Sequence, residues 1–279
     1  MTRSRSPKTS RSTTPQHLAL AARGLGPDRC IPPEAALALL AVTACTAIEP
    51  RGGPRPLAVF VGVADVSGSA SIENRCAELS ARLRTVVEDR RTRRLDVLAL
   101  ATGEGMAGEP RVLVPWTTYV PTTGLYETPG AAVRHRTAWV AEVERTCRAN
   151  LRPGGTSPVF EAVERGLQAI TARCEEVTRM GFRCTRKVLA VQSDLRSTHG
   201  DFGAYLRGLA VKKPKKAPAL PRRLAADGVE LSFCGLSNTD AGDGLPAEAV
   251  LAGWSEVLGR RIVVDPTCEA APSTPGGPP

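Results

Sequence analysis

Continuous apolar runs and segments with helical periodicity alternate along the middle of the chain. Residues 57–63 form one such run, Leu-Ala-Val-Phe-Val-Gly-Val, which is typical of a strand buried on both faces of a parallel sheet. Residues 72–87 then place apolar side chains at helical spacing, and residues 95–101 form a second apolar run. This order predicts a strand, a helix and a second strand.

The alternation continues to residue 264. A Gly-, Pro- and Thr-rich stretch allows a short strand near 112–114 and 119–120. The other expected elements are helices at 130–149, 158–180 and 246–259 and strands at 187–192, 229–234 and 261–264. Strands that alternate with helices return through right-handed crossovers. We therefore predict an α/β fold of Rossmann-like type, with a doubly wound, mostly parallel central sheet and helices on both faces.

The flanks of this region differ from it in composition. Residues 1–33 are rich in Ser, Thr, Pro and Arg and lack hydrophobic periodicity, so they are expected to be disordered or to form a leader. Residues 34–56 combine an apolar segment with a linker that contains Pro, Gly and Arg. Residues 266–279 form a Pro/Gly/Ser/Thr tail that is expected to be disordered. The folded domain is therefore expected to span residues 57–265.

The apolar segment at 35–44 ends at Cys45. Its ten residues are too few to cross a bilayer but suit the apolar region of a signal peptide. The ending Val-Thr-Ala-Cys resembles a bacterial lipobox, which implies that Cys45 is lipidated and becomes the mature N-terminus, anchored to the membrane. The preceding region is long for a signal peptide, and acidic residues and prolines at 28–34 interrupt it. A short amphipathic helix packed on the domain is the alternative interpretation.

The formal net charge of +9 and the pI near 9.5 would favour acidic partners, anionic lipid or nucleic acid. Much of this excess lies in the N-terminal segment and in a basic 207–223 loop, and such charge runs are typical of solvated tails and loops. The basic loop lacks interleaved aromatic residues and any nucleic-acid-binding motif, so nucleic acid is not expected as a partner. The role of the loop is not indicated by its sequence.

Candidate chemistry begins directly after the first strand, where Asp65, Ser67 and Ser69 occupy alternate positions. Ligands of open α/β sheets bind at the carboxyl ends of the strands. A carboxylate and two hydroxyls on a tight loop can point at one centre, and oxygen donors are the ligands that Mg²⁺ prefers. The pattern is weak alone, because Ser and Asp also cap helices.

Two more oxygen donors stand at comparable positions. Thr156 follows a glycine turn at Gly154 and Gly155 and precedes the expected 158–180 helix. Asp194 follows the expected strand at 187–192, again at the carboxyl edge of the sheet. Thr156 or Ser157 could instead be an ordinary N-cap of the helix.

Together, these three pieces resemble the metal-ion-dependent adhesion site of von Willebrand factor type A domains in order, spacing and strand context. The resemblance covers roughly residues 57–265. It implies a bound Mg²⁺, or Mn²⁺ or Ca²⁺, and a protein ligand whose acidic residue fills an open coordination position. The implied direct ligands are Ser67, Ser69 and Thr156, and the implied water-mediated ligands are Asp65 and Asp194.

The sequence departs from the family after Asp194. Leu195 stands where the family more commonly has glycine, and Arg196 adds a cation near the rim of the site. The metal itself is still expected, although partner specificity can differ.

Binding rather than catalysis is expected from this resemblance. No Ser-His-Asp or Cys-His grouping is apparent, and neither His135 nor His199 has a partner at catalytic spacing. The leading hypothesis is a metal-dependent, adhesion-type protein-binding module, which the lipobox resemblance extends to a lipoprotein of a bacterial cell envelope. The alternative is a cytoplasmic assembly factor that works with an AAA+ ATPase. Both hypotheses use the same metal site, so only the cellular compartment of the protein distinguishes them.

Eight cysteines are many for a reduced cytosolic protein of this size. No CxxC pair is present and only three histidines occur, so a zinc site is not expected. If the domain is exported, Cys174 and Cys184 are the expected local disulfide, because they flank a helix end and a glycine turn that can bring them together. The alternative is a pair of buried thiols.

Overall fold

The long apolar run that opens the domain becomes β1 (Arg55–Ala64), a strand whose side chains are buried from Leu57 onward. In the computed structural model, β1 pairs in parallel with β2 (Leu95–Glu104) on one side and with β4 (Phe182–Gln192) on the other. Because both faces of this strand are covered, its sequence shows no polar alternation. The structure describes residues 54–67, 72–89, 94–104, 110–121, 128–154, 158–196, 200–213, 216–220, 228–235, 245–262 and 264–265.

The described strands form one sheet in the order β3-β2-β1-β4-β5-β6. The remaining strands are β3 (Pro110–Tyr119), β5 (Glu230–Cys234) and β6 (Val264–Asp265). Only the β2–β3 pair is antiparallel among them, and the other neighbours run parallel. The predicted doubly wound, mostly parallel α/β sheet is therefore confirmed. Its strand order reverses direction between β1 and β4, which makes that pair the topological switch point.

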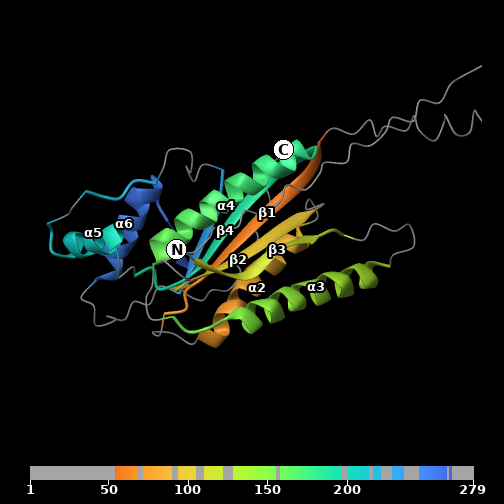
Figure 1. Ribbon diagram of the computed structural model, residues 1–279, viewed down its shortest axis with the longest axis horizontal. Helices are drawn as coiled ribbons and strands as arrows, with labels where there is room; N and C mark the ends of the chain where they lie inside the picture. Colours follow the sequence, from red (N-terminus) through yellow and green to blue (C-terminus); the bar gives the residue numbers. More distant parts are fainter. Residues whose placement is uncertain are drawn as a thin grey trace, which may run out of the picture. The chain divides into compact units, whose positions relative to one another are not determined.

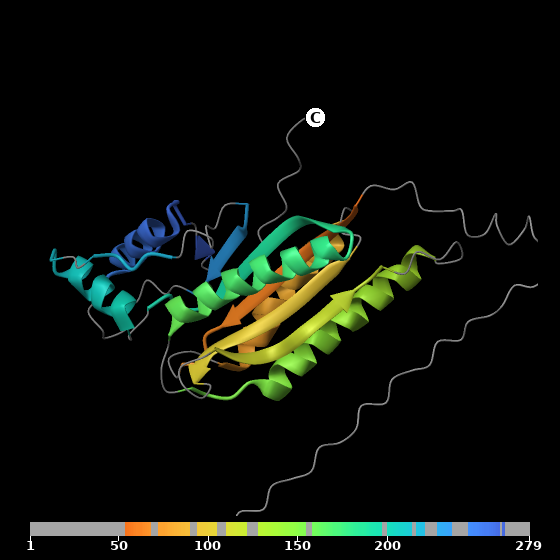
Figure 2. The same cartoon turned by 45° about the horizontal axis from the view of Figure 1, so that its top comes forward.

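Helices cover both faces of the sheet (Figures 1 and 2). One face carries α2 (Ile72–Glu88) and α3 (Pro129–Asn150). The other face carries α4 (Val159–Arg179), α5 (Gly200–Ala210) and α6 (Ala247–Leu258). None of the helices in the described part of the chain has an apolar stretch long enough to cross a membrane.

Alternate side chains of β1 supply the two cores. Val59, Val61 and Val63 face α4, whereas Phe60 faces α2. At Gly166 of α4, an added Cβ would meet a methyl carbon of Leu189 at 2.8 Å, so glycine lets the helix lie close to β1 and β4. This close packing fixes α4 along the two strands whose ends form the candidate site.

Several element boundaries differ from the sequence-based expectations, including that of β6, which is Val264–Asp265 rather than 261–264. The weakly predicted strand near 112–120 is a ten-residue edge strand, β3, with a register irregularity against β2. β4 begins at Phe182, five residues earlier than expected. α5 was not predicted, and it includes the first residues of the segment expected as a basic 207–223 loop.

The flanking segments lie outside the described residues. These are 1–33, most of 34–56 and 266–279, and with them the expected lipidation position, Cys45. Their predicted disorder, leader and linker therefore stay predictions.

Candidate metal site at the switch point of the sheet

Asp65 and Asp194 lie at the same carboxyl edge of the sheet, because Asp65 directly follows β1 and Asp194 stands two residues after the end of β4. β1 ends at Ala64 and β4 ends at Gln192, and these two residues are register partners. The backbone N–H of Asp65 donates to the carbonyl of Gln192 at 2.8 Å, which extends the pairing by one residue. Ligands of doubly wound sheets bind at this kind of crevice.

The carboxylate of Asp65 is 4% exposed and is held from three directions. Its Oδ1 accepts from the backbone N–H of Ser67 at 3.0 Å and from the hydroxyl of Thr102 at 2.9 Å. Its Oδ2 accepts from the hydroxyl of Ser193 at 2.7 Å. These bonds come from β2 and from the loops after β1 and β4, and they hold the carboxylate in one orientation.

Ser67 lies beside the glycine turn that precedes α4. An isolated parallel bridge joins Ser67 to Gly154, and the N–H of Gly154 donates to the carbonyl of Val66 at 2.9 Å. The loop that contains Thr156 therefore starts next to the loop that contains Ser67. The side chains of Ser69 and Thr156 lie outside the described residues. The N-cap of α4 is Pro158, which makes no side-chain capping bond.

Asp194 is half-buried, and burial is the main cause that raises the pKa of its carboxyl group above the ordinary value. The neighbouring charge of Asp65 raises it further. The backbone N–H of Arg196, which donates to Oδ1 at 2.9 Å, and the charges of Arg196 and Arg75 act in the opposite direction. Two carboxylates thus share one partly desolvated edge, which is an environment that attracts a cation.

Leu195 supplies the backbone turn after Asp194, at the position where the resemblance to type A domains implies glycine. Its φ is 60°, in the left-handed region that is unfavourable for a branched side chain. Its N–H donates to the hydroxyl of Ser193 at 2.9 Å, and its carbonyl accepts from the indole of Trp254 at 3.0 Å. Its side chain is fully buried. The departure from glycine therefore keeps the turn and anchors it to the core.

The described donors fit a hard divalent cation. The carboxylates of Asp65 and Asp194 lie at the switch point with the backbone of Ser67 beside Asp65, and oxygen donors are the ligands that Mg²⁺ and Mn²⁺ take. Within the described ranges no group of three His, Cys, Asp or Glu side chains could hold a metal ion.

Two residues of the site were not singled out from the sequence. Thr102 lies one residue beyond Ala101, the register partner of Ala64, so the parallel pairing of β1 with β2 places it beside Asp65. Ser193 precedes the predicted ligand Asp194, and its hydroxyl links the loops after β1 and β4. The signal for Thr102 was a polar residue at the end of a buried apolar strand.

The structure joins Cys174 to Cys184 and Cys76 to Cys147 in disulfides, with Cα–Cα distances of 5.4 and 5.8 Å. Cys234 is also disulfide-bonded. The first pair closes the turn between α4 and β4, and the second ties α2 to α3.

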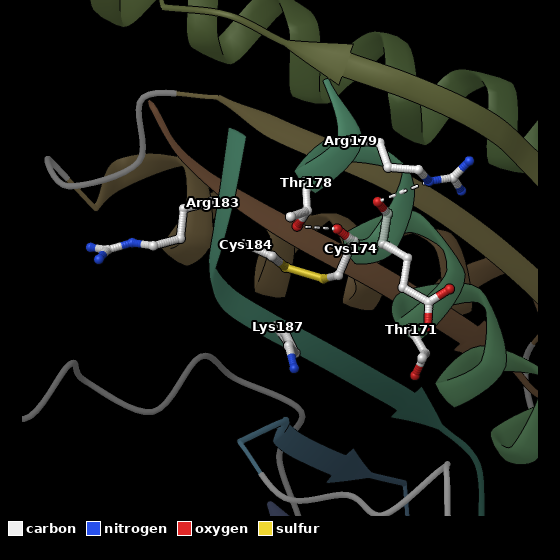
Figure 3. Close-up of a pocket in the computed structure, with 8 residues that line it drawn as sticks. Thr171, Cys174, Thr178, Arg179, Arg183, Cys184 and Lys187 are labelled. Carbon is white, nitrogen blue, oxygen red and sulfur yellow. Dashed lines mark hydrogen bonds between the residues drawn. A yellow bond between two sulfur atoms is a disulfide. The ribbon is translucent and has the colours of Figure 1, made fainter. Parts of the chain in front are cut away.

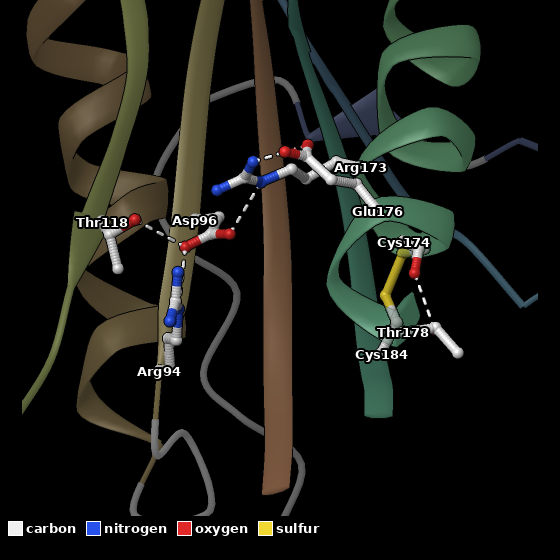
Figure 4. Close-up of polar contacts among 8 residues, drawn as sticks. All are labelled: Arg94, Asp96, Thr118, Arg173, Cys174, Glu176, Thr178 and Cys184. Atoms are coloured by element: carbon white, nitrogen blue, oxygen red, sulfur yellow. Dashed lines mark hydrogen bonds and ion pairs between the residues drawn. A yellow bond between two sulfur atoms is a disulfide. The ribbon is translucent and has the colours of Figure 1, made fainter. Parts of the chain in front are cut away.

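A buried ion cluster lies at the opposite ends of the strands (Figure 4). The carboxylate of Asp96, fully buried on β2, accepts from the Thr118 hydroxyl at 2.8 Å and pairs with Arg94 at 3.3 Å and Arg173 at 2.8 Å. These contacts tie α4 to the β2–β3 edge. Because the carboxylate is enclosed by its partners, we assign this cluster a structural role.

A pocket of about 640 Å³ lies between the end of α4 and the start of β4, beside the Cys174–Cys184 disulfide (Figure 3). The side chains of Arg179, Arg183 and Lys187 line it, but their charged ends point in different directions. They therefore do not form a converged anion site. The pocket also lies at the far end of β4 from Asp194.

The fold and the site together define a doubly wound α/β domain with a carboxylate and hydroxyl cluster at its switch point. No family model matches the sequence, and no curated protein matches it.

Three solved structures illustrate the similarity that structure comparison finds. An aerotolerance-related membrane protein from Bacteroides fragilis is 11% identical, over 64% of this chain and 67% of that chain, with a TM-score of 0.33. The pilus adhesin SpaC from Lactobacillus rhamnosus GG in its open conformation is 12% identical, over 77% of this chain and 28% of that chain, with a TM-score of 0.42. Manganese-loaded TRAP protein from Plasmodium vivax is 14% identical, over 71% of this chain and 63% of that chain, with a TM-score of 0.33. At these values the comparisons assign neither a family nor a function, and the fold class rests on the sheet order.

Proposed function

We propose that the domain is a metal-dependent protein-binding module of the von Willebrand factor type A kind. Ser67, Ser69 and Thr156 would coordinate Mg²⁺, or Mn²⁺ or Ca²⁺, while Asp65 and Asp194 would act through water. When bound, the metal would supply a Lewis-acidic centre for a carboxylate of a partner protein. The domain would thus bind its partner rather than catalyse a reaction.

The observation that carries this proposal is the convergence of Asp65 and Asp194 at the switch point. The hydroxyl of Ser193 holds Asp65 on the β4 side, and the bridge between Ser67 and Gly154 brings the third loop to the same edge. Helix capping does not require so many hydrogen bonds to one buried carboxylate. Here the carboxylate accepts them from neighbouring loops and strands.

Isothermal titration of the full chain with Mn²⁺ and Mg²⁺ tests the proposal. We expect one site in the wild type and no measurable binding in Asp65→Ala, because the loops around the metal lose their common anchor. Asp201→Ala removes an exposed carboxylate from the first turn of α5 and serves as the matched control. Equal affinities of the wild type and Asp65→Ala would show that the site assignment is wrong.

We further propose that the protein is a lipid-anchored component of a bacterial cell envelope. The disulfides support an oxidising compartment, because structural disulfides are rare in the reduced cytosol. Labelling with a fatty-acid analogue in a bacterial host should mark the wild type and not Cys45→Ser. Unlabelled protein with free thiols in the soluble fraction would instead favour the cytoplasmic assembly factor that works with an AAA+ ATPase.

A further inference from the structure

Arg75 is a buried cation next to the candidate metal site. It belongs to the first turns of α2, directly after the loop that contains Ser67, and is only 6% exposed. Its guanidinium forms one ion pair, from Nη1 to Glu78 at 3.2 Å, and Glu78 itself is partly exposed. Its buried Nε has no hydrogen-bond partner among the described residues. A buried guanidinium with so little local compensation needs an electrostatic reason to be there.

The position of Gly235 shows where the guanidinium lies. This glycine follows β5 and has a φ of 95°. An added Cβ there would come within 2.9 Å of Nη1 of Arg75 and 3.1 Å of the carbonyl oxygen of Ser193. Arg75 thus reaches from α2 across the ends of the central strands to the backbone that precedes Asp194. Its charge is also one of the two that lower the pKa of the Asp194 carboxyl against the effect of burial.

We propose that Arg75 is a built-in counter-ion of Asp194 that sets the metal affinity of the site, so that a divalent cation must bind against its charge. This inference rests on the proposed metal site and assigns Arg75 a role opposed to that of the ligands. Without metal, the guanidinium compensates the half-buried carboxylate. With metal, the same fixed charge repels the incoming cation across a partly desolvated space, where screening by water and salt is weak.

The consequence is a site that fills only when divalent cations are abundant. The second cation, Arg196, is held by its own contact to the carbonyl of Leu245 and by its backbone bond to Asp194. Arg75 is therefore the cation whose removal alters the charge of the site while the loop after β4 keeps its contacts.

Titration of the full chain with Mn²⁺ tests this role in three variants. Arg75→Gln removes the charge, and we expect it to tighten Mn²⁺ binding by about tenfold. Arg75→Lys keeps the charge and should stay within about twofold of the wild type. Arg84→Gln removes an exposed cation from the same helix and should leave the affinity unchanged.

Thermal unfolding adds a second readout. Arg75→Gln should unfold at a lower temperature than the wild type without metal, because Asp194 loses its counter-ion, and should gain more stability from a given Mn²⁺ concentration. If the glutamine variant does not fold, Arg75→Met keeps the apolar stem and carries the same expectation.

Three results would overturn the proposal. If the wild type binds Mn²⁺ and folded Arg75→Gln binds it with equal or weaker affinity, the role of Arg75 is refuted. The proposed metal site itself would stand. Equal tightening in Arg84→Gln would show an effect of net charge only. Absence of Mn²⁺ binding in both the wild type and Arg75→Gln would refute the metal site itself and this inference with it.

Discussion

Asp65 shows how a single side chain organises the site. A buried carboxylate is unfavourable unless it is compensated, and here the compensation comes from three hydrogen bonds that arrive from different loops and strands. Each donor therefore fixes the carboxylate and is in turn fixed by it. The side chain is oriented before any ligand arrives.

Thr102 gives a direct test of that role. Its hydroxyl donates to Asp65 and accepts from the N–H of Val66 at 3.2 Å, so Thr102→Val removes one donor from the Asp65 carboxylate and the side-chain acceptor of the Val66 N–H. We expect a loss of roughly 1–3 kcal/mol in the free energy of unfolding, measured by urea denaturation. Thr117→Val, at a half-buried position on β3 without such bonds, is the matched control. An equal loss in both variants would contradict the account.

At the scale of the elements, the strands that are buried on both faces were predictable from the sequence, whereas α5 and the exposed first half of β4 were not. β1 was recognised because a strand covered on both faces is a continuous apolar run. α5 was missed because Gly200, Gly203 and Gly208 lower helix propensity, although Phe202 and Leu206 have helical spacing and are buried. The first half of β4 was missed because it is exposed on alternate residues, with a pattern that also fits a turn.

The same distinction holds for the site. The carboxylates were found because each stands within two residues of the end of an apolar strand. The roles of Thr102, Arg75 and Asp96 depend on pairing between segments far apart in the sequence. Such contacts are fixed by the tertiary fold, and no local pattern in a single sequence reports them.

The Cys76–Cys147 and Cys174–Cys184 disulfides differ in the chain segments that they constrain. Cys76–Cys147 spans 71 residues and Cys174–Cys184 spans 10. Loop-closure entropy predicts stabilisation of about 4 kcal/mol for the longer loop and about 3 kcal/mol for the shorter one. We therefore expect Cys76→Ala/Cys147→Ala to lower the denaturation midpoint in an oxidised preparation more than Cys174→Ala/Cys184→Ala does. The reverse order would show that packing at the α4–β4 turn dominates.

The contact between α5 and α6 predicts a dependence of stability on alkaline pH. Burial and the hydrogen bond to Glu256 raise the pKa of Tyr205 from 10.0 to about 12. Below pH 10 both the folded and the unfolded chain keep this proton. Above it the unfolded chain releases the proton first, so the contribution to stability is lost as the pH rises from about 10 to about 12.

Unfolding free energies of the wild type and Tyr205→Phe between pH 9 and pH 12 measure this contribution. The wild type should lose up to about 2 kcal/mol more than the variant across that range. Parallel curves for the two proteins would contradict the assignment.

At the scale of the whole molecule, the fold explains why the site lies where it does. The sheet order places β1 and β4 as neighbours whose connections leave in opposite directions, and this opens the crevice at their carboxyl ends. α4 then runs back from the glycine turn beside Ser67 along both strands. A partner protein that approaches this edge would meet the proposed metal site, the loops after β1 and β4, and the buried Arg75 and Arg196 together.

The central claim, a divalent metal at the switch point, is tested most directly by a crystal of the protein grown with Mn²⁺ and measured for anomalous scattering. We predict one strong peak between the ends of β1 and β4, within about 2.5 Å of the Ser67 hydroxyl, as direct coordination requires. The carboxylates of Asp65 and Asp194 should reach it through water. Ordered density for these loops without a peak at this edge would contradict the account, as would a peak held by other residues.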